Sequence, residues 1–147
     1  ELFTDVTASL GIDFILSNGA TGERYVNETM LGGGGWIDYD GDGWLDLYLA
    51  NGHEASRDAG QAGKAGNRLY RNLAGKGFED VTLRAGVGDQ RYSNGVCVGD
   101  YDNDGDQDLF VTNFGRNTLY RHKGDGTSQY ATISAGLTLE GVSASPT

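Results

Sequence analysis

The chain has 147 residues, the size of one ordinary domain, and 25 of them are glycine, while a single proline excludes a collagen-like chain. Its 21 acidic and 11 basic residues give a formal net charge of −10, which argues against nucleic acid or an anionic membrane surface as a partner because both attract basic patches. No apolar run approaches the roughly 20 residues of a membrane-spanning helix.

The first 31 residues are expected to form a leading strand and a hairpin. The strand is predicted at residues 3–6, because Phe3-Thr4-Asp5-Val6-Thr7 recurs later as Phe78-Glu79-Asp80-Val81-Thr82. The hairpin is predicted between Phe14 and Val26, with its turn at an Asn-Gly or a Thr-Gly pair. Asn27 begins an N-glycosylation sequon, a candidate site in an extracellular protein, although such triplets are also common by chance.

Residues 32–87 are expected to form a first β-repeat of four short strands. Alternating apolar residues and β-branched or aromatic side chains predict these strands at about residues 35–37, 45–50, 67–72 and 77–82. An inserted loop, within residues 52–66, separates the second strand from the third. No stretch of the chain has a convincing helical period.

Residues 88–137 are expected to form a second repeat, followed by a tail at residues 138–147. Its strands are predicted at about residues 95–99, 108–113, 118–122 and 129–134. The run DYDGDGWLDLYLAN from Asp38 matches DYDNDGDQDLFVTN from Asp100 at an offset of 62, and NRLYR from Asn67 matches NTLYR from Asn117 at an offset of 50. The difference of 12 is assigned to the inserted loop. The sequence therefore predicts an all-β chain of two related units.

Each unit contains the acidic run D-x-D-x-D-G-x-x-D between its first two strands. Its aspartates are Asp38, Asp40, Asp42 and Asp46 in the first loop (residues 38–46), and Asp100, Asp102, Asp104 and Asp108 in the second loop (residues 100–108). Without these eight aspartates the net charge falls from −10 to −2, so the charge belongs to two local sites. Four neighbouring carboxylates repel one another unless a cation binds them, and hard oxygens at alternate positions suit Ca²⁺.

Two Ca²⁺ sites are therefore predicted, one in each loop. The glycine at position 6 permits the sharp turn, and the backbone carbonyl at position 7, from Trp44 or Asp106, is expected as a further ligand. An EF-hand is excluded because position 12 is Leu49 or Val111, in strand-like runs, rather than glutamate. Plain Asp-Gly turns could explain one copy, but two copies with identical spacing favour Ca²⁺. Mg²⁺ is a weaker alternative, since it prefers fewer carboxylates and keeps its waters.

Other side chains are interpreted as structural. Tyr39 and Tyr101 occupy matching places in the loops and are expected to pack over the cation sites. Cys97 has no cysteine partner and lies between two valines, so it is predicted to be a small buried residue. The aromatic residues expected in the core are Trp36, Trp44, Tyr48, Tyr70, Phe110 and Tyr120. No catalytic triad, Cys-His pair, phosphate-binding loop or zinc spacing is visible, and the chain is predicted not to be an enzyme.

These motifs resemble the FG-GAP/VCBS repeats of integrin-α-like β-propellers, and more closely the N-terminal part of the ASPIC/UnbV group. The match is carried by the F-x-D-V-T starts at Phe3 and Phe78, the glycines at residues 32–35, the two acidic runs, and the N-x-L-Y-R strands at Asn67 and Asn117. The resemblance implies that each repeat is a four-stranded propeller blade, that the loop aspartates hold Ca²⁺, and that the protein is extracellular and non-enzymatic.

A propeller needs at least four blades, so two blades are not enough to close one. Four arrangements are open: a piece of a longer chain, a ring closed by several chains, an open array, or a two-sheet sandwich. The leading hypothesis is an extracellular calcium-binding module for structural assembly or adhesion, which self-associates head to tail into a ring or filament by adding its leading strand to a neighbouring molecule.

The alternative is a glycan- or protein-ligand-binding propeller fragment of a larger secreted protein. Its site would lie on loops such as the inserted one. That loop contains no aromatic residue between Gly52 and Gly66, which weakens this alternative. An enzyme is the third possibility, and no residue set in the sequence supports it.

Overall fold

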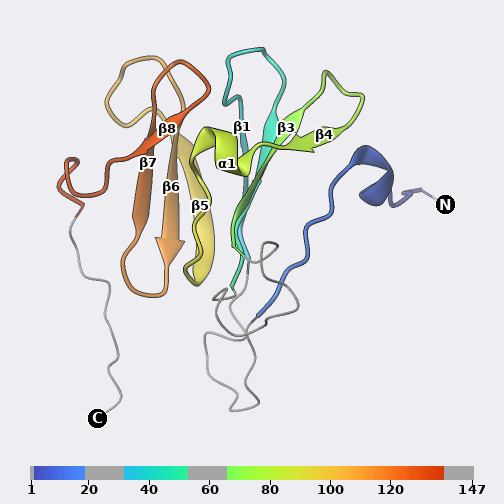
Figure 1. Ribbon diagram of the computed structural model, residues 1–147, viewed down its shortest axis with the longest axis horizontal. Helices are drawn as coiled ribbons and strands as arrows, with labels where there is room; N and C mark the ends of the chain where they lie inside the picture. The colour runs from blue at the N-terminus through green and yellow to red at the C-terminus, as the bar shows by residue number, and fades with distance from the viewer. Residues whose placement is uncertain (1, 19–31, 53–65, 138–147) are drawn as a thin grey trace, which may run out of the picture.

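A computed structural model describes residues 2–18, 32–52 and 66–137 (Figure 1). Within these residues the strands form two antiparallel four-stranded sheets, each with its strands in chain order. The first sheet consists of β1 (Gly34–Ile37), β2 (Asp46–Leu49), β3 (Arg68–Asn72) and β4 (Phe78–Asp80). The second consists of β5 (Ser93–Gly99), β6 (Asp108–Asn113), β7 (Thr118–His122) and β8 (Ser128–Tyr130). The predicted all-β fold with two four-stranded units, too few to close a propeller, is confirmed.

The two sheets pair equivalent residues. Leu47 faces Tyr70 at the centre of the first sheet, and Leu109 faces Tyr120 at the same place in the second. The offset between the repeats is therefore 62 residues on the second strand and 50 on the third. The 12 additional residues of the first repeat lie between β2 and β3, as the sequence comparison predicts.

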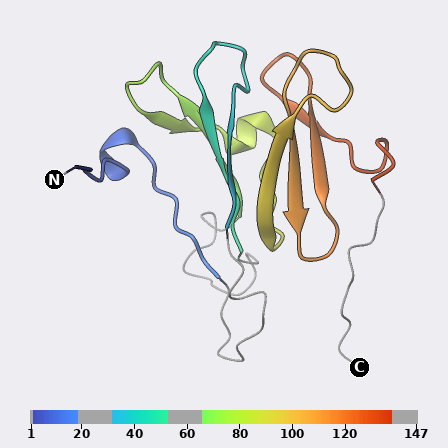
Figure 2. The ribbon, with the colours of Figure 1, turned by 180° about the vertical axis from the view of Figure 1, so that it is seen from behind.

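The sheets pack face to face, with the one-turn helix α1 (Thr82–Ala85) between them (Figures 1 and 2). We call the face that carries the row Gly35, Tyr48 and Leu69 the front face of the first sheet, and the row Trp36, Leu47 and Tyr70 its back face. The equivalent rows of the second sheet are Cys97, Phe110 and Leu119 at the front, and Val98, Leu109 and Tyr120 at the back. The front face of the first sheet and the back face of the second share one hydrophobic core.

Glycine and polar side chains complete this interface. A Cβ at Gly35 would lie only 3.0 Å from Cγ1 of Val96, so the missing side chain allows the close approach of the sheets. Asn67 donates from Nδ2 to Oγ of Ser93 at 2.9 Å, which links the first sheet to the second across the interface. These contacts fix the position of the first loop relative to the second repeat.

The last strand of each unit is shorter than predicted. β4 ends at Asp80 and β8 at Tyr130, rather than at residues 82 and 134. Asp80 Oδ1 accepts hydrogen bonds from the backbone N–H and the hydroxyl of Thr82, at 3.0 and 2.6 Å. The Thr82 hydroxyl oxygen in turn accepts the N–H of Leu69 at 2.9 Å. Because a side chain replaces the next backbone partner, the chain turns away from the sheet into α1.

Residues 2–18 lie beside the first sheet, on the side away from the second sheet (Figures 1 and 2). They contain a short 3₁₀ turn (Ala8–Leu10) and no strand, so the predicted leading strand at residues 3–6 is wrong. Its counterpart Phe78 pairs with β3, whereas residues 3–6 pair with none of the described strands. The segment is held instead by the Tyr70 hydroxyl, which donates to Asp13 Oδ1 at 3.0 Å.

Several predictions lie wholly or partly outside the described residues. These are the turn of the N-terminal hairpin, the Asn27 sequon, the inserted loop from residue 53 to 65, and the tail. The described part of the hairpin, residues 14–18, contains no strand. Among the helices of the described ranges, none has the length and apolar character needed to cross a bilayer.

The predicted core is correct for the tyrosines and wrong for three other residues. Tyr48, Tyr70 and Tyr120 are buried, and Phe110 is half-buried. Trp36 is 55% exposed, Trp44 is exposed and Cys97 is also exposed. Trp36 and Cys97 lie on the back face of the first sheet and the front face of the second, and no described strand packs on either of those faces.

Candidate metal centre

The two acidic loops lie at the same end of the sheets (Figures 1 and 2). Each loop has a left-handed backbone at positions 4 and 6: φ is 70° at Gly41, 84° at Gly43, 60° at Asn103 and 96° at Gly105. Glycine adopts this conformation without steric cost, and asparagine tolerates it better than most residues. The predicted role of glycine at position 6 is confirmed, and position 4 has the same left-handed conformation, with glycine in the first loop and asparagine in the second.

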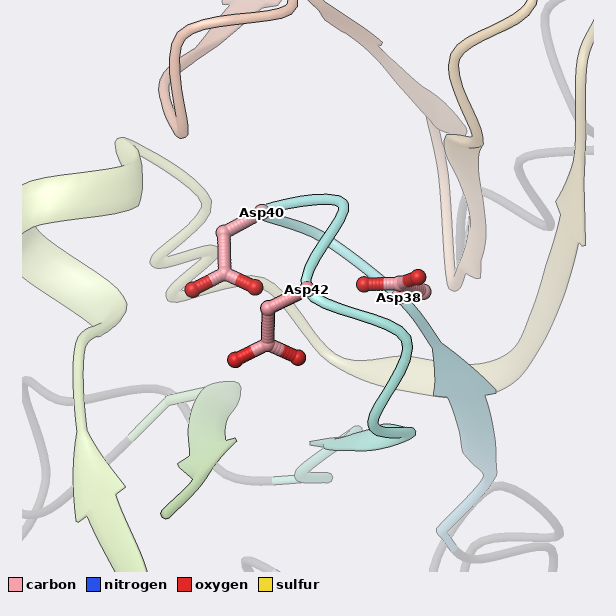
Figure 3. Close-up of side chains that lie close together, drawn as sticks. All are labelled: Asp38, Asp40 and Asp42. Carbon is pink, nitrogen blue, oxygen red and sulfur yellow. The ribbon is translucent and has the colours of Figure 1, made fainter. Parts of the chain in front are cut away.

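Three carboxylates converge in each loop. Asp38, Asp40 and Asp42 each offer one oxygen, and these oxygens lie within 4.8 Å of one another; Figure 3 shows the three side chains on the turn between β1 and β2. In the second loop the group is Asp100, Asp102 and Asp108, so its third member comes from position 9 rather than from position 5. The structure therefore brings together six of the eight predicted carboxylate ligands in two groups.

Short-range hydrogen bonds shape both loops in the same way. The carboxylate at position 1 accepts the N–H of position 6, from Gly43 to Asp38 Oδ2 at 3.0 Å, and from Gly105 to Asp100 Oδ2 at 2.9 Å. These bonds curl the backbone so that alternate side chains point to a common centre. The backbone carbonyl ligands expected at position 7, from Trp44 and Asp106, stay predictions.

The aspartate at position 9 fastens each loop to the third strand. Asp46 accepts the N–H of Tyr39 at 3.0 Å and the N–H of Asn72 at 2.7 Å, and Asp108 makes the equivalent two bonds in the second repeat. Both side chains are buried, and this burial raises the pKa of both carboxyls, an effect only partly opposed by the backbone hydrogen bonds. Asp46 thus has a structural role in addition to its predicted role as a ligand.

Two arginines contact the loops, and neither is among the site residues predicted from the sequence. Arg71 places Nε 2.5 Å from Asp40 Oδ2 and Nη2 3.1 Å from Asp42 Oδ2. Arg121 repeats this arrangement, with Nε 2.6 Å from Asp102 Oδ2 and Nη2 2.8 Å from Asp104 Oδ2. The available signal was the shared N-x-L-Y-R run, in which both arginines are the last residue.

Charge pairing changes the pKa values of these groups. The Asp40 carboxylate raises the pKa of Arg71, and the hydrogen bond to Asp104 raises that of Arg121. The same hydrogen bond from Arg121 lowers the pKa of Asp104. The arginines therefore neutralise one negative charge per loop and leave the other carboxylates uncompensated.

The residues of the first loop fit a bound divalent cation. Asp38 Oδ1 and Asp40 Oδ1 are buried and have no hydrogen-bond partner among the residues that the structure describes. Buried charged oxygens are costly unless a cation or a donor satisfies them. The clustered donors are all carboxylate oxygens, the ligands that Ca²⁺ and Mg²⁺ prefer.

An open cleft of about 300 Å³ lies beside the first loop, lined by Tyr39, Asp40, Arg71, Arg84 and residues 124–127. Tyr39 is only 4% exposed, and its hydroxyl accepts a hydrogen bond from Arg84 at 2.9 Å. Its counterpart Tyr101 is 44% exposed. The loop tyrosine is therefore buried in the first repeat, where the second repeat provides a neighbouring surface, and its predicted packing over the cation site stays a prediction.

The sheet pairing and the two equivalent loops identify a repeat protein, and a comparison with known families agrees. The model of the FG-GAP-like repeat family matches residues 38–111 and residues 100–146. The chain belongs to the FG-GAP-like repeat family. Each of its FG-GAP-like matches begins at the first aspartate of one acidic loop. No curated protein matches the chain. The finer resemblance to the ASPIC/UnbV group stays a prediction.

Proposed function

We propose that the chain is a calcium-binding structural or adhesive module of an extracellular protein and is not an enzyme. The observation that carries this proposal is the pair of buried, unpartnered oxygens on Asp38 and Asp40 within a group of three carboxylates. Extracellular calcium modules bind in about the 10⁻⁴–10⁻³ M range, which suits loops that are largely open to solvent. FG-GAP-like repeats are in general structural or binding units.

Calcium would act by stabilising the folded loops. Asp38, Asp40 and Asp42 would hold it in the first repeat, and Asp100, Asp102 and Asp108 in the second. A bound ion supplies positive charge to carboxylates that otherwise repel one another, so binding adds to the free energy of folding. One site stabilises the protein by about 2.7 kcal/mol when calcium is present at 100 times its Kd.

Asp40→Ala tests this proposal. We expect the wild-type protein to melt at a lower temperature in EGTA than in calcium. Asp40→Ala should lower the melting temperature in calcium and remove much of the difference that EGTA produces. Asp5→Ala is the matched control, because Asp5 is an exposed aspartate outside both loops whose side chain bonds only to local groups at Thr7. Repeating the measurement with magnesium distinguishes the two ions.

A wild-type melting temperature that is the same in calcium and EGTA would count against calcium binding. Calcium binding by the first loop would also be contradicted if calcium raised the melting temperature of Asp40→Ala as much as that of the wild type. A larger stabilisation by magnesium than by calcium would move the assignment to Mg²⁺.

Head-to-tail self-association is the second part of the proposal. Equivalent residues differ in exposure according to which face has a neighbour: Tyr39 is buried and Tyr101 exposed, and Val87 is buried while its counterpart Leu137 is exposed. In the first repeat, the front face of the sheet packs on the back face of the second sheet. The front face of the second sheet is equivalent to it in sequence but has no such neighbour among the described strands. The corresponding surface of a second copy is the exposed part of the back face of the first sheet around Trp36, because residues 2–18 already contact this face at Tyr70. In this proposal, copies associate by packing one sheet face on another, and not by adding residues 3–6 as a strand to a neighbouring molecule.

Analytical ultracentrifugation tests the assembly. We expect association that grows with protein concentration, in a head-to-tail series. Phe110→Arg on the front face of the second sheet should reduce it, since a charge would be buried in the contact. Thr127→Arg, on the β7–β8 turn outside that face, is the control. A wild-type monomer at all concentrations would overturn self-association without affecting the calcium proposal.

A second candidate function is binding of a glycan or a protein ligand. The cleft beside the first loop favours it, because Arg84, Asp125 and Thr127 supply donors and acceptors around an open volume of about 300 Å³. Binding to a panel of immobilised glycans that Arg84→Ala abolishes would support this function. Equal binding by the wild type and Arg84→Ala would exclude the cleft as the site.

A further inference from the structure

The same arginine contact occurs in both repeats. Arg71 and Arg121 are the second-to-last residues of the equivalent strands β3 and β7, and each guanidinium bridges the aspartates at positions 3 and 5 of its own loop. Two independent copies of a bidentate contact show that the arrangement belongs to the repeat. Arg68 lies on the same strand as Arg71 but pairs with Asp80, at 2.9 Å, away from the loop.

We propose that Arg71 and Arg121 are the resident counter-ions of the two loops, and that a cation entering a loop competes with a guanidinium for the charge of the same carboxylates. This inference rests on the proposed function, because it concerns how the calcium sites are tuned. It gives the arginines the role of positioning residues that set the calcium affinity.

The oxygens used by the arginine indicate how the competition works. Arg71 contacts Oδ2 of Asp40, while Oδ1 of the same residue stays buried and unpartnered. A cation could therefore bind to the free oxygen without displacing the side chain. The competition is electrostatic, since the guanidinium keeps its positive charge at all accessible pH values and stays close to the cation.

The charge of each loop indicates whether the arginine raises or lowers its calcium affinity. The aspartates at positions 1, 3, 5 and 9 give each loop a charge of −4, which one arginine reduces to −3, and the second loop has Asp106 in addition. Calcium affinity in such sites depends on the charge of the ligands and on the rigidity of the site. The arginine stabilises the calcium-free loop more than the calcium-bound loop, so it lowers the affinity and keeps the loop folded without metal.

Arg71→Met tests this inference in the full chain. Isothermal titration calorimetry should give about fivefold tighter calcium binding at one site, a change of the size expected from one partly exposed ion pair. The melting temperature in EGTA should fall by about 2–4 °C, and the loss in saturating calcium should be smaller. Arg121→Met should do the same at the other site.

Two further variants separate charge from fold stability. Arg68→Met removes an arginine from the same strand without touching a loop, so it should leave calcium affinity unchanged. Arg71→Lys keeps the positive charge on a flexible side chain, and its calcium affinity should lie near that of the wild type. This rescue would not be expected if Arg71 only packed against the sheet.

Weaker or unchanged calcium binding by both arginine-to-methionine variants would overturn the inference, and so would an equal loss of stability in calcium and in EGTA. Different results would overturn the proposed function of calcium binding. A wild type that binds no calcium, together with an Arg71→Met/Arg121→Met protein that does, would overturn the proposed function and support the competition. No calcium binding by either protein would overturn both.

Discussion

Gly33→Ala should weaken the contact between the two sheets. A Cβ at this residue would lie 2.7 Å from Cα of Gly95, a backbone atom that cannot rotate away. At the next residue, Gly34, a Cβ would meet its nearest neighbours at 3.4 Å, an ordinary van der Waals distance. The two substitutions are chemically identical and adjacent, so they differ mainly in what the added methyl group meets.

The expected magnitude follows from two opposing terms. Overpacking against a rigid neighbour costs about 1–3 kcal/mol. Replacing glycine by alanine recovers about 0.4–1 kcal/mol by restricting the unfolded chain. Gly33→Ala should therefore lose about 1–2 kcal/mol of unfolding free energy, or about 3–8 °C in melting temperature for a chain of this size. Gly34→Ala should be neutral or more stable by about 0.5 kcal/mol.

Urea unfolding followed by circular dichroism is the appropriate measurement, made in EGTA so that metal binding does not contribute. The midpoint should fall for Gly33→Ala and not for Gly34→Ala, with the same dependence on urea. Equal midpoints for the two variants would refute the close backbone approach of Gly33 to Gly95, and with it the packing of the sheets described above.

Three further substitutions have distinct expected outcomes. Tyr39→Ala should cost about 3–5 kcal/mol of unfolding free energy because the ring is buried, whereas Tyr101→Ala should cost less than about 1 kcal/mol; similar values in urea unfolding would contradict the asymmetry. Thr82→Val should cost about 1–2 kcal/mol, because the N–H of Leu69 loses its acceptor, and amide hydrogen exchange at Leu69 should accelerate; unchanged protection would contradict that role. Gly43→Ala should cost about 1–2 kcal/mol from its left-handed backbone and weaken calcium binding in calorimetry, and wild-type affinity would contradict the role of this turn.

The repeat was the most predictable feature of the chain. Its two offsets, 62 and 50 residues, come directly from matching sequence and reappear as the register of equivalent strands. β6 (Asp108–Asn113) and β7 (Thr118–His122) have the predicted bounds. Strand pairing in a repeat is local, so the alternation of apolar residues and the turn chemistry between strands are sufficient to define it.

Strand ends and burial depend on partners that alternation does not reveal. The stretch Asp80-Val81-Thr82 has a strand-like composition, yet the Thr82 hydroxyl takes the place of a backbone partner and ends the sheet. Cys97 lies between Val96 and Val98 in an apolar strand, but its face has no described neighbouring sheet. A sequence shows which residues share a face, whereas exposure also depends on whether another element covers that face.

The candidate site was predictable in its acidic residues and not in its basic ones. Spacing identified the aspartates, because oxygen ligands at alternate positions have a direct chemical meaning. Arg71 lies 25 or more residues after its loop, beyond the inserted segment, and only the pairing of β2 with β3 brings it to Asp40 and Asp42. The repetition of this arginine in the second unit was visible in the sequence, but its partner was not.

The arginines also change the interpretation of the net charge. The eight aspartates at positions 1, 3, 5 and 9 of the loops and the two arginines together carry −6 of the total of −10. Two calcium ions would reduce this contribution to about −2. The loops are therefore partly neutralised before any metal binds, and the hydrophobic core between the sheets includes only one loop side chain, that of Tyr39. Removal of calcium should consequently lower the stability of the protein without unfolding its sheets.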